Sequence, residues 1–297
     1  MPSLSARLAG FVLRTSGYYR RMYSGGALFQ KNLAKVRAAR LAEPSAKMRS
    51  ELDVSQSDFG GRPVWRIAPG GTPASAHVLY WHGGGYVYPA MPAHWAFMAH
   101  MAKQHKWAIT APLYPLAPEE SAITTTAWAL DFYRSYASGL AGKPFVMGGD
   151  SAGGGLTAAT AMLARDAGIA MPAGLLLVAP WLDIDPGHPD QKAIEPRDAI
   201  LTLNGIREGG QMYAGNLAVT DPRVSPLYGD WSNLPPILTF GGGDDILVTD
   251  ARALKEKVPS VDYFELAGMI HDWPLFSFPE SRKAQLQMAD FVKRAIP

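Results

Sequence analysis

The sequence predicts an α/β fold: a doubly wound, mostly parallel sheet with helices on both faces. From about residue 62 onward, short β-rich runs alternate with helical stretches. Several of these runs are apolar at every position, which is typical of parallel strands that are covered on both faces. The length of 297 residues and the hydrophobic content of 47% suit one large domain with a substantial core.

Seven short runs bounded by turn-forming residues are the expected strands. They are Val64–Ile67, His77–Trp81, Ala108–Pro112, Phe145–Gly148, Leu175–Pro180, Ile237–Phe240 and Val261–Leu266. Helices are expected between them, near 93–104, 121–138, 154–167, 249–257 and 280–295. The region 183–233 breaks the alternation, because it is rich in Pro, Gly, Asp and Asn and has one helical patch at Leu203–Asn216. We interpret this region as an insertion or lid, not as a second domain.

Residues 1–50 differ from the rest of the chain in charge. They hold ten Lys or Arg and one Glu, a net charge of +9, whereas residues 51–297 carry −7, so the overall +2 hides an asymmetry. Apolar residues at Leu4, Leu8, Phe11 and Val12 repeat at helical spacing, and a second helical stretch runs from about Ala27 to Leu41. We expect helices that dock electrostatically on the acidic body. A basic amphipathic helix on a membrane surface is the alternative.

Composition excludes several classes of site and location. The chain has no cysteine, which rules out disulfides, a thiol nucleophile and cysteine-based zinc sites. The apolar run 8–13 is bracketed by Arg7 and Arg14 and is too short for a signal peptide or a membrane span. No nucleic-acid-binding motif accompanies the basic segment. We therefore expect a cytoplasmic protein with no nucleic-acid partner and no stable membrane insertion.

The strongest functional motif surrounds Ser151. Gly149-Asp150-Ser151-Ala152-Gly153 fits G-x-S-x-G, follows an apolar strand and precedes an Ala-rich helix. This strand–turn–helix context is typical of a nucleophile elbow, in which a strained serine needs neighbours with almost no side chain. The positive end of the following helix would favour negative charge beside the serine. The motif predicts that Ser151 is a nucleophile.

A second motif, His82-Gly83-Gly84-Gly85, directly follows the expected strand at 77–81. Glycine backbones can approach a ligand closely, and their N–H groups can stabilise the oxyanion that forms during acyl transfer. Ala152, the residue after the nucleophile, would supply a partner donor. A phosphate-binding loop is disfavoured, because no Gly-Lys-Ser/Thr sequence follows.

A catalytic triad in this context has its acid and then its histidine downstream of the serine. Only His188 and His271 lie beyond Ser151. We choose His271, which follows a late strand, over His188, which lies in the irregular insertion. The strand at 237–240 leads into both Asp244 and Asp245, and spacing alone does not separate these two candidates for the acid.

These motifs resemble the hormone-sensitive-lipase-like family of α/β-hydrolases, in its bacterial esterase branch. The segments 82–86, 114–119 and 149–154 are similar to its H-G-G-G-aromatic, Y-R-L-A-P-E and G-D-S-A-G-G motifs, with Pro115 in place of the usual arginine. Stretches at 180–183 and 221–226 also match. The resemblance covers about 77–290 and implies an α/β-hydrolase fold of about eight strands. Residues 51–297 would form the catalytic domain, capped by residues 1–50 and the insertion.

The resemblance also implies roles for individual residues. The family's D-x-L pattern selects Asp245 as the acid beside Ser151 and His271. The oxyanion hole carries over to Gly84, Gly85 and Ala152, with His82 and Gly83 supporting the glycine loop. An aromatic, methionine-containing substrate pocket is expected from side chains near these motifs: Tyr86, His94, Met212, Tyr213 and Trp273.

The implied activity is that of a serine carboxylesterase acting on small-molecule esters with small to medium acyl chains, through an acyl-enzyme and without a metal or organic cofactor. An amide-directed hydrolase with the same triad is one alternative. A non-catalytic receptor on the same fold is another, disfavoured because His271 is present. Family members often pair through an edge strand, here Val261–Leu266, although no sequence feature requires a homodimer.

Overall fold

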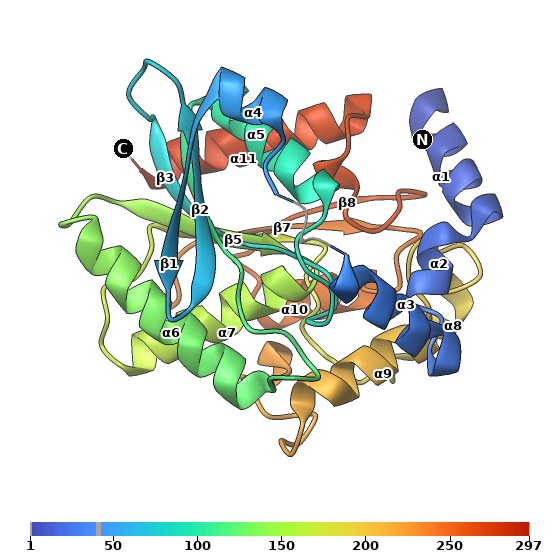
Figure 1. The fold of residues 1–297 in the computed structure, drawn as a ribbon. Helices are drawn as coiled ribbons and strands as arrows, with labels where there is room; N and C mark the ends of the chain where they lie inside the picture. The colour runs from blue at the N-terminus through green and yellow to red at the C-terminus, as the bar shows by residue number, and fades with distance from the viewer. Residues whose placement is uncertain (1, 40–42, 297) are drawn as a thin grey trace.

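The computed structural model describes residues 2–39 and 43–296. Its centre is an eight-stranded sheet with the strand order β1-β2-β4-β3-β5-β6-β7-β8 (Figure 1). The strands are β1 (Leu52–Phe59), β2 (Arg62–Pro69), β3 (Ala76–Trp81), β4 (Trp107–Pro112), β5 (Phe145–Asp150), β6 (Gly174–Val178), β7 (Ile237–Gly242) and β8 (Asp262–Leu266). β2 pairs antiparallel with β1 and β4, and all other pairs are parallel. The predicted α/β fold is confirmed.

All seven expected strands are present, with small shifts at their ends. The strand expected at Leu175–Pro180 ends earlier, at Val178, because Ala179 has a φ of 41° and leaves the extended conformation. β1 is an eighth strand, which agrees with the number that the resemblance implies but whose position the residue pattern does not indicate. Its sequence LDVSQSDF is largely polar and exposed, and it is held by a ladder that runs from Leu52 opposite Pro69 to Phe59 opposite Arg62.

Helices cover both faces of the sheet. α5 (Pro92–His105) and α11 (Pro279–Ala295) lie on one face, and α6 (Ala122–Gly139), α7 (Ala152–Asp166) and α10 (Val248–Lys257) lie on the other (Figure 1). α7 is buried from its first residue to Met162, and its Gly and Ala residues allow it to pack closely on β5. The expected helices are all present.

A second group of helices comes from the N-terminal segment and the insertion. α1 (Leu4–Ser16), α2 (Tyr18–Met22), α3 (Gly26–Ala38) and α4 (Ala46–Glu51) precede β1, whereas α8 (Pro189–Ile194) and α9 (Leu203–Ala214) belong to the insertion. α3 lies beside α9 (Figure 1). The expected end of a helix at Leu41 lies outside the described residues. The division into a cap and a catalytic domain stays a prediction.

The N-terminal segment places Met22, Tyr23, Phe29 and Leu33 in the core, and most of its polar contacts go to backbone carbonyls. Arg20 Nη1 donates to the carbonyl oxygens of Glu195 and Asp198 at 2.9 and 2.7 Å. Among the basic residues of 2–39 and 43–50, only Arg37 forms an ion pair with the rest of the described chain, to Glu119. Opposite charge therefore contributes less to this docking than the charge asymmetry led us to expect.

Candidate active site

Ser151 lies on a sharp turn between β5 and α7. Its φ of 52° and ψ of −121° are strained for a residue with a side chain. A Cβ atom at Gly149 would overlap the carbonyl oxygen of Gly153, so the turn requires a glycine there. The Ser151 N–H donates to the carbonyl oxygen of Val178 at 2.8 Å, which fixes the turn against β6. The local geometry is that of the expected elbow.

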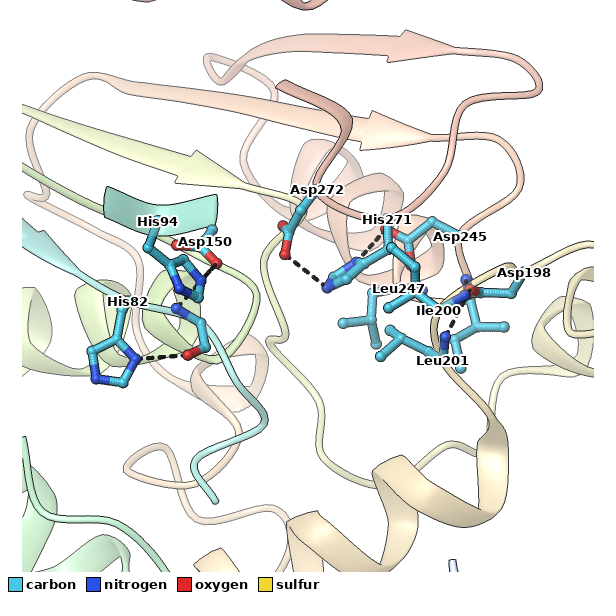
Figure 2. A network of polar contacts seen from close by, with 12 residues as sticks. His82, His94, Asp150, Asp198, Ile200, Leu201, Asp245, Leu247, His271 and Asp272 are labelled. Atoms are coloured by element: carbon cyan, nitrogen blue, oxygen red, sulfur yellow. Dashed lines mark hydrogen bonds and ion pairs between the residues drawn. The ribbon is translucent and has the colours of Figure 1, made fainter. Parts of the chain in front are cut away.

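His271 and Asp245 meet on the loops that follow β8 and β7 (Figure 2). His271 Nδ1 lies 2.8 Å from Asp245 Oδ2, and both side chains are buried. The carboxylate is itself held by the Leu247 N–H, which donates to Asp245 Oδ1 at 2.8 Å. A buried carboxylate on Nδ1 fixes both the orientation and the tautomer of a histidine.

The two competing candidates lie elsewhere. Asp244 accepts a hydrogen bond at 2.9 Å from Nε of Arg197. His188 is exposed and caps α8, where its Nδ1 accepts the N–H of Asp190 at 3.2 Å. The structure therefore brings Asp245, and not Asp244, to His271.

A second carboxylate contacts the same imidazole. Asp272 Oδ2 lies 3.1 Å from His271 Nε2 (Figure 2). Burial lowers the pKa of His271, whereas Asp245 and Asp272 raise it, and the net pKa lies well above the ordinary value. Burial raises the pKa of Asp272 to about 6. Sequence reasoning did not single out Asp272, whose other oxygen is buried and has no hydrogen-bond partner within the described part of the chain.

The glycine loop presents free N–H groups. Gly84 and Gly85 have φ values of 123° and 62°, and a Cβ atom at Gly84 would lie 2.6 Å from the carbonyl oxygen of Tyr88. Within residues 2–39 and 43–296, the N–H groups of Gly84, Gly85 and Ala152 donate to no acceptor. Ala152 is the first residue of α7, where backbone donors have no partner inside the helix. These three groups are available to an oxyanion.

Asp150 ties the elbow to the glycine loop (Figure 2). Its buried carboxylate accepts hydrogen bonds from Tyr80 Oη at 2.7 Å, the Gly83 N–H at 3.0 Å and His94 Nε2 at 3.0 Å. His94 Nδ1 accepts the Met91 N–H at 2.8 Å, so Nε2 carries the hydrogen and donates the hydrogen bond to Asp150. Sequence reasoning treated Asp150 only as part of a motif, because its partners are distant in the chain.

His82 holds the glycine loop through contacts to Gly83 and Tyr114. Its Nδ1 donates to the carbonyl oxygen of Gly83 at 2.7 Å, and its ring stacks on Tyr114 with centroids 4.5 Å apart. Burial lowers the pKa of His82 to about 4, so the ring is neutral at physiological pH. The Gly83 N–H is already used by Asp150, which leaves Gly83 and His82 as supporting residues.

Known proteins share this architecture. A sequence profile of the alpha/beta hydrolase fold matches residues 78–275. The chain belongs to the alpha/beta hydrolase family. LipR of Mycobacterium tuberculosis is 35% identical to this hydrolase over 235 residues, covering 76% of this chain and 75% of LipR. An acetyl-hydrolase of Streptomyces hygroscopicus is 31% identical over 231 residues, covering 73% and 75%.

A solved structure places this alpha/beta hydrolase in the hormone-sensitive-lipase-like branch. A hormone-sensitive lipase from a metagenome library superposes with a TM-score of 0.84 and 25% identity, and the match covers 100% of both chains. Further relatives are named as esterases and carboxylesterases. The expected family is confirmed, and so is the expected enzyme class, an ester hydrolase.

Two cavities lie beside Ser151 in the hydrolase. The first measures about 10 Å³ and is lined mainly by apolar groups that include Phe29, Trp181, Ile206 and Gly209. The second measures about 60 Å³ and combines apolar side chains with His94, His271 and Asp272. Ser151 therefore lines both a narrow apolar space and a wider one that contains polar groups.

Of the five expected pocket residues, only His94 lines either of these cavities. Tyr86 and Tyr213 are buried and stack on each other, with centroids 3.6 Å apart. Trp273 is buried, and its indole N–H donates to the carbonyl oxygen of Gly241 at 3.1 Å. Met212 packs against the core. The expectation was wrong for these four, because their apolar surface serves packing around the site.

Asp198, in the insertion, is a further buried residue that the sequence did not reveal. Its Oδ1 accepts the N–H groups of Ile200 and Leu201, both at 2.8 Å, and its Oδ2 accepts the N–H of Ile246 at 2.9 Å (Figure 2). Because Ile246 follows Asp245, this carboxylate connects the insertion to the loop that carries the acid. No local pattern marks such a long-range role.

Two further properties concern metals and membranes. Across the described ranges, no group of His, Asp and Glu side chains is arranged to hold a metal ion. Within the same residues, no helix combines the length and the apolar character needed to cross a bilayer.

Proposed function

We propose that this hydrolase cleaves carboxylic esters with short acyl chains, with Ser151 as nucleophile, His271 as general base and Asp245 as its partner. The observation that carries the proposal is the buried hydrogen bond of 2.8 Å between His271 Nδ1 and Asp245 Oδ2, in a site that also contains the strained Ser151. This is the arrangement by which a histidine activates a serine hydroxyl.

In the proposed reaction, His271 accepts the Ser151 proton while the serine oxygen attacks the ester carbonyl. Asp245 stabilises the imidazolium that forms. The N–H groups of Gly84, Gly85 and Ala152 stabilise the tetrahedral oxyanion, an effect worth about 3–4 kcal/mol for a single donor in a comparable site. His271 then protonates the departing alcohol, and water releases the acyl group by the same sequence of steps.

The size of the apolar cavity favours an ester with a short acyl group. Its small volume of about 10 Å³ leaves little room between Phe29, Trp181 and Ile206. The wider cavity, which contains His94 and Asp272, would receive the alcohol part of the ester. The name of the Streptomyces acetyl-hydrolase is consistent with such a short acyl chain.

Hydrolysis of p-nitrophenyl acetate, butyrate and octanoate by the wild-type chain and by Ser151→Ala tests this proposal. We expect turnover to decrease with chain length in the wild type and to be abolished in the variant, which should keep the wild-type circular dichroism spectrum. Wild-type turnover in Ser151→Ala would refute the nucleophile. Parallel assays with p-nitroacetanilide distinguish an amide-directed hydrolase, for which the anilide would be the better substrate.

A further inference from the structure

α1 exposes four of its large apolar side chains, whereas the side that faces the protein body consists of small residues and the half-buried Leu13. Leu4, Leu8, Phe11 and Val12 are 79%, 60%, 56% and 51% exposed, whereas the buried residues of α1 are Ala6 and Gly10. A helix that only covers a protein core shows the opposite pattern. A contiguous apolar surface of this kind indicates an interaction site.

The four exposed apolar residues form one stripe along the helix. At about 100° per residue, they fall within roughly 100° of the helix circumference. Arg7 and Arg14 follow one edge of the stripe, and both are exposed. Ala6 and Gly10 lie on the opposite side, where Gly10 faces Ile270: a Cβ atom there would lie 3.4 Å from Ile270 Cγ2.

The orientation of this stripe is fixed. At the N-terminal end, Ser3 Oγ donates to Glu280 at 2.9 Å, and at the C-terminal end Arg14 Nη1 donates to the carbonyl oxygen of Arg197 at 3.0 Å. Gly17 ends the helix in the left-handed conformation, with its N–H donating to the carbonyl oxygen of Leu13. α1 lies at the periphery of the molecule (Figure 1), and all four side chains of the stripe are more than half exposed. Leu4, Leu8 and Phe11 also border an open groove against Asp244 and Ile270.

Charge identifies the kind of partner that fits this surface. α1 and α2 together contain four arginines and no acidic residue, and residues 1–50 carry a net charge of +9. Tyr18, which starts α2, is 57% exposed and extends the surface with an aromatic ring. Apolar side chains with adjacent arginines and an aromatic residue are the combination that binds the headgroup region of an anionic membrane.

We propose that the face of α1 formed by Leu4, Leu8, Phe11 and Val12 docks on the surface of anionic phospholipid bilayers, with Arg7 and Arg14 at the phosphate groups. The apolar side chains enter the interface, and no segment crosses the bilayer. The docked surface lies near the catalytic segment, because Ile270 beneath Gly10 directly precedes His271. This docking does not depend on the catalytic roles proposed above.

Co-sedimentation of the full chain with vesicles tests the proposal. The vesicles contain phosphatidylcholine and phosphatidylglycerol in equal parts, or phosphatidylcholine alone. The test variant is Leu8→Asp/Phe11→Asp. The matched control is Ile123→Asp/Leu286→Asp, which makes the same exchange at apolar residues that are 47% and 57% exposed on α6 and α11.

We expect the wild type and the control to bind the mixed vesicles and the test variant to lose about tenfold or more in partitioning. Arg7→Gln/Arg14→Gln should weaken binding to the mixed vesicles and make it less sensitive to salt. All variants should hydrolyse a soluble p-nitrophenyl ester as the wild type does, in the absence of vesicles.

Three outcomes would overturn the docking proposal and leave the proposed catalytic roles unaffected. The wild type could fail to sediment with the mixed vesicles, or the control could lose binding as much as the test variant does. Light scattering could also show a wild-type dimer that Leu8→Asp/Phe11→Asp converts to a monomer, in which case the face binds a second copy of the chain.

Discussion

His271 Nε2 lies 3.1 Å from Asp272 Oδ2, so the nitrogen that would accept the Ser151 proton faces a carboxylate. A hydrogen bond between these two groups requires a shared proton, since an unprotonated Nε2 and an ionised carboxylate are both acceptors. In the proposed mechanism, Nε2 must be unprotonated before Ser151 can be activated. The pH at which activity appears should therefore depend on Asp272.

Asp272→Asn should move the acid limb of kcat/KM to lower pH. Asp245 and Asp272 both raise the pKa of His271 against the lowering effect of burial, so removing one negative charge lowers that pKa. The unprotonated, active histidine then persists to lower pH. We expect a shift of roughly one pH unit, measured with a soluble ester between pH 4 and 9.

Several other titratable groups face Asp272. His271 lowers the pKa of Asp272, whereas Asp150 and Asp245 raise it, and the Tyr19, Tyr23 and His94 side chains line the same cavity. Asp244→Asn is the matched control, because Asp244 pairs with Arg197 and not with His271. An acid limb that is unchanged in Asp272→Asn, or shifted equally in the control, would contradict the assignment.

Asp245→Asn should reduce kcat far more than Asp244→Asn does. The buried bond of 2.8 Å to His271 Nδ1 fixes the tautomer of the ring, and an amide at this position favours the wrong one. We expect a loss of about 10³–10⁴-fold for Asp245→Asn and little change for Asp244→Asn. Steady-state kinetics of the two variants would settle the order, and the reverse ranking would reassign the acid.

Ile206→Ala should extend the range of acyl chains that the enzyme accepts. Ile206 is buried and lines the narrow cavity, so its truncation enlarges the space proposed for the acyl group. Ile194→Ala is the control, because Ile194 is equally buried but lines neither cavity beside Ser151. Both changes should cost about 2–5 kcal/mol of stability. Only Ile206→Ala should raise the ratio of octanoate to acetate hydrolysis. A similar rise in Ile194→Ala would show that a general loss of stability, and not the larger cavity, causes the change.

Asp198→Asn should destabilise the fold. Both carboxylate oxygens of this buried side chain accept backbone N–H groups, and an asparagine must point its NH₂ group at one set of these donors. We expect a loss of about 1–3 kcal/mol in the free energy of unfolding, measured by urea denaturation at pH 7. Asp185→Asn, at an exposed carboxylate, should stay close to the wild-type value. Equal stability of both variants would argue against this role of Asp198.

Sequence patterns predicted the parts of the fold that are locally encoded. Buried parallel strands such as β5 and β6 are apolar at most positions, and the elbow needs glycines at fixed offsets from Ser151, so both are visible in a short window. β1 is an exposed edge strand of largely polar residues, and its pairing with β2 defines it. No hydrophobic pattern marks such a strand.

The candidate site also contains locally encoded residues and residues whose contacts are long-range. Ser151 and the glycine loop follow from motifs, whereas the contacts of Asp150, Asp198 and Asp272 join segments that are distant in the chain or depend on how a buried loop turns. The pocket prediction failed for Tyr86 and Tyr213 for a related reason. Their mutual stacking buries both rings, and nothing in the sequence shows that these two residues meet.

The central claim is that Ser151 forms the acyl-enzyme. Labelling the enzyme with diethyl p-nitrophenyl phosphate, followed by peptide mass spectrometry, tests it most directly, because the reagent phosphorylates an activated serine much faster than an ordinary side chain. We predict one adduct per chain, on Ser151, forming in parallel with the loss of esterase activity and absent in Ser151→Ala. An adduct on another residue, or full inactivation with Ser151 unmodified, would contradict the account.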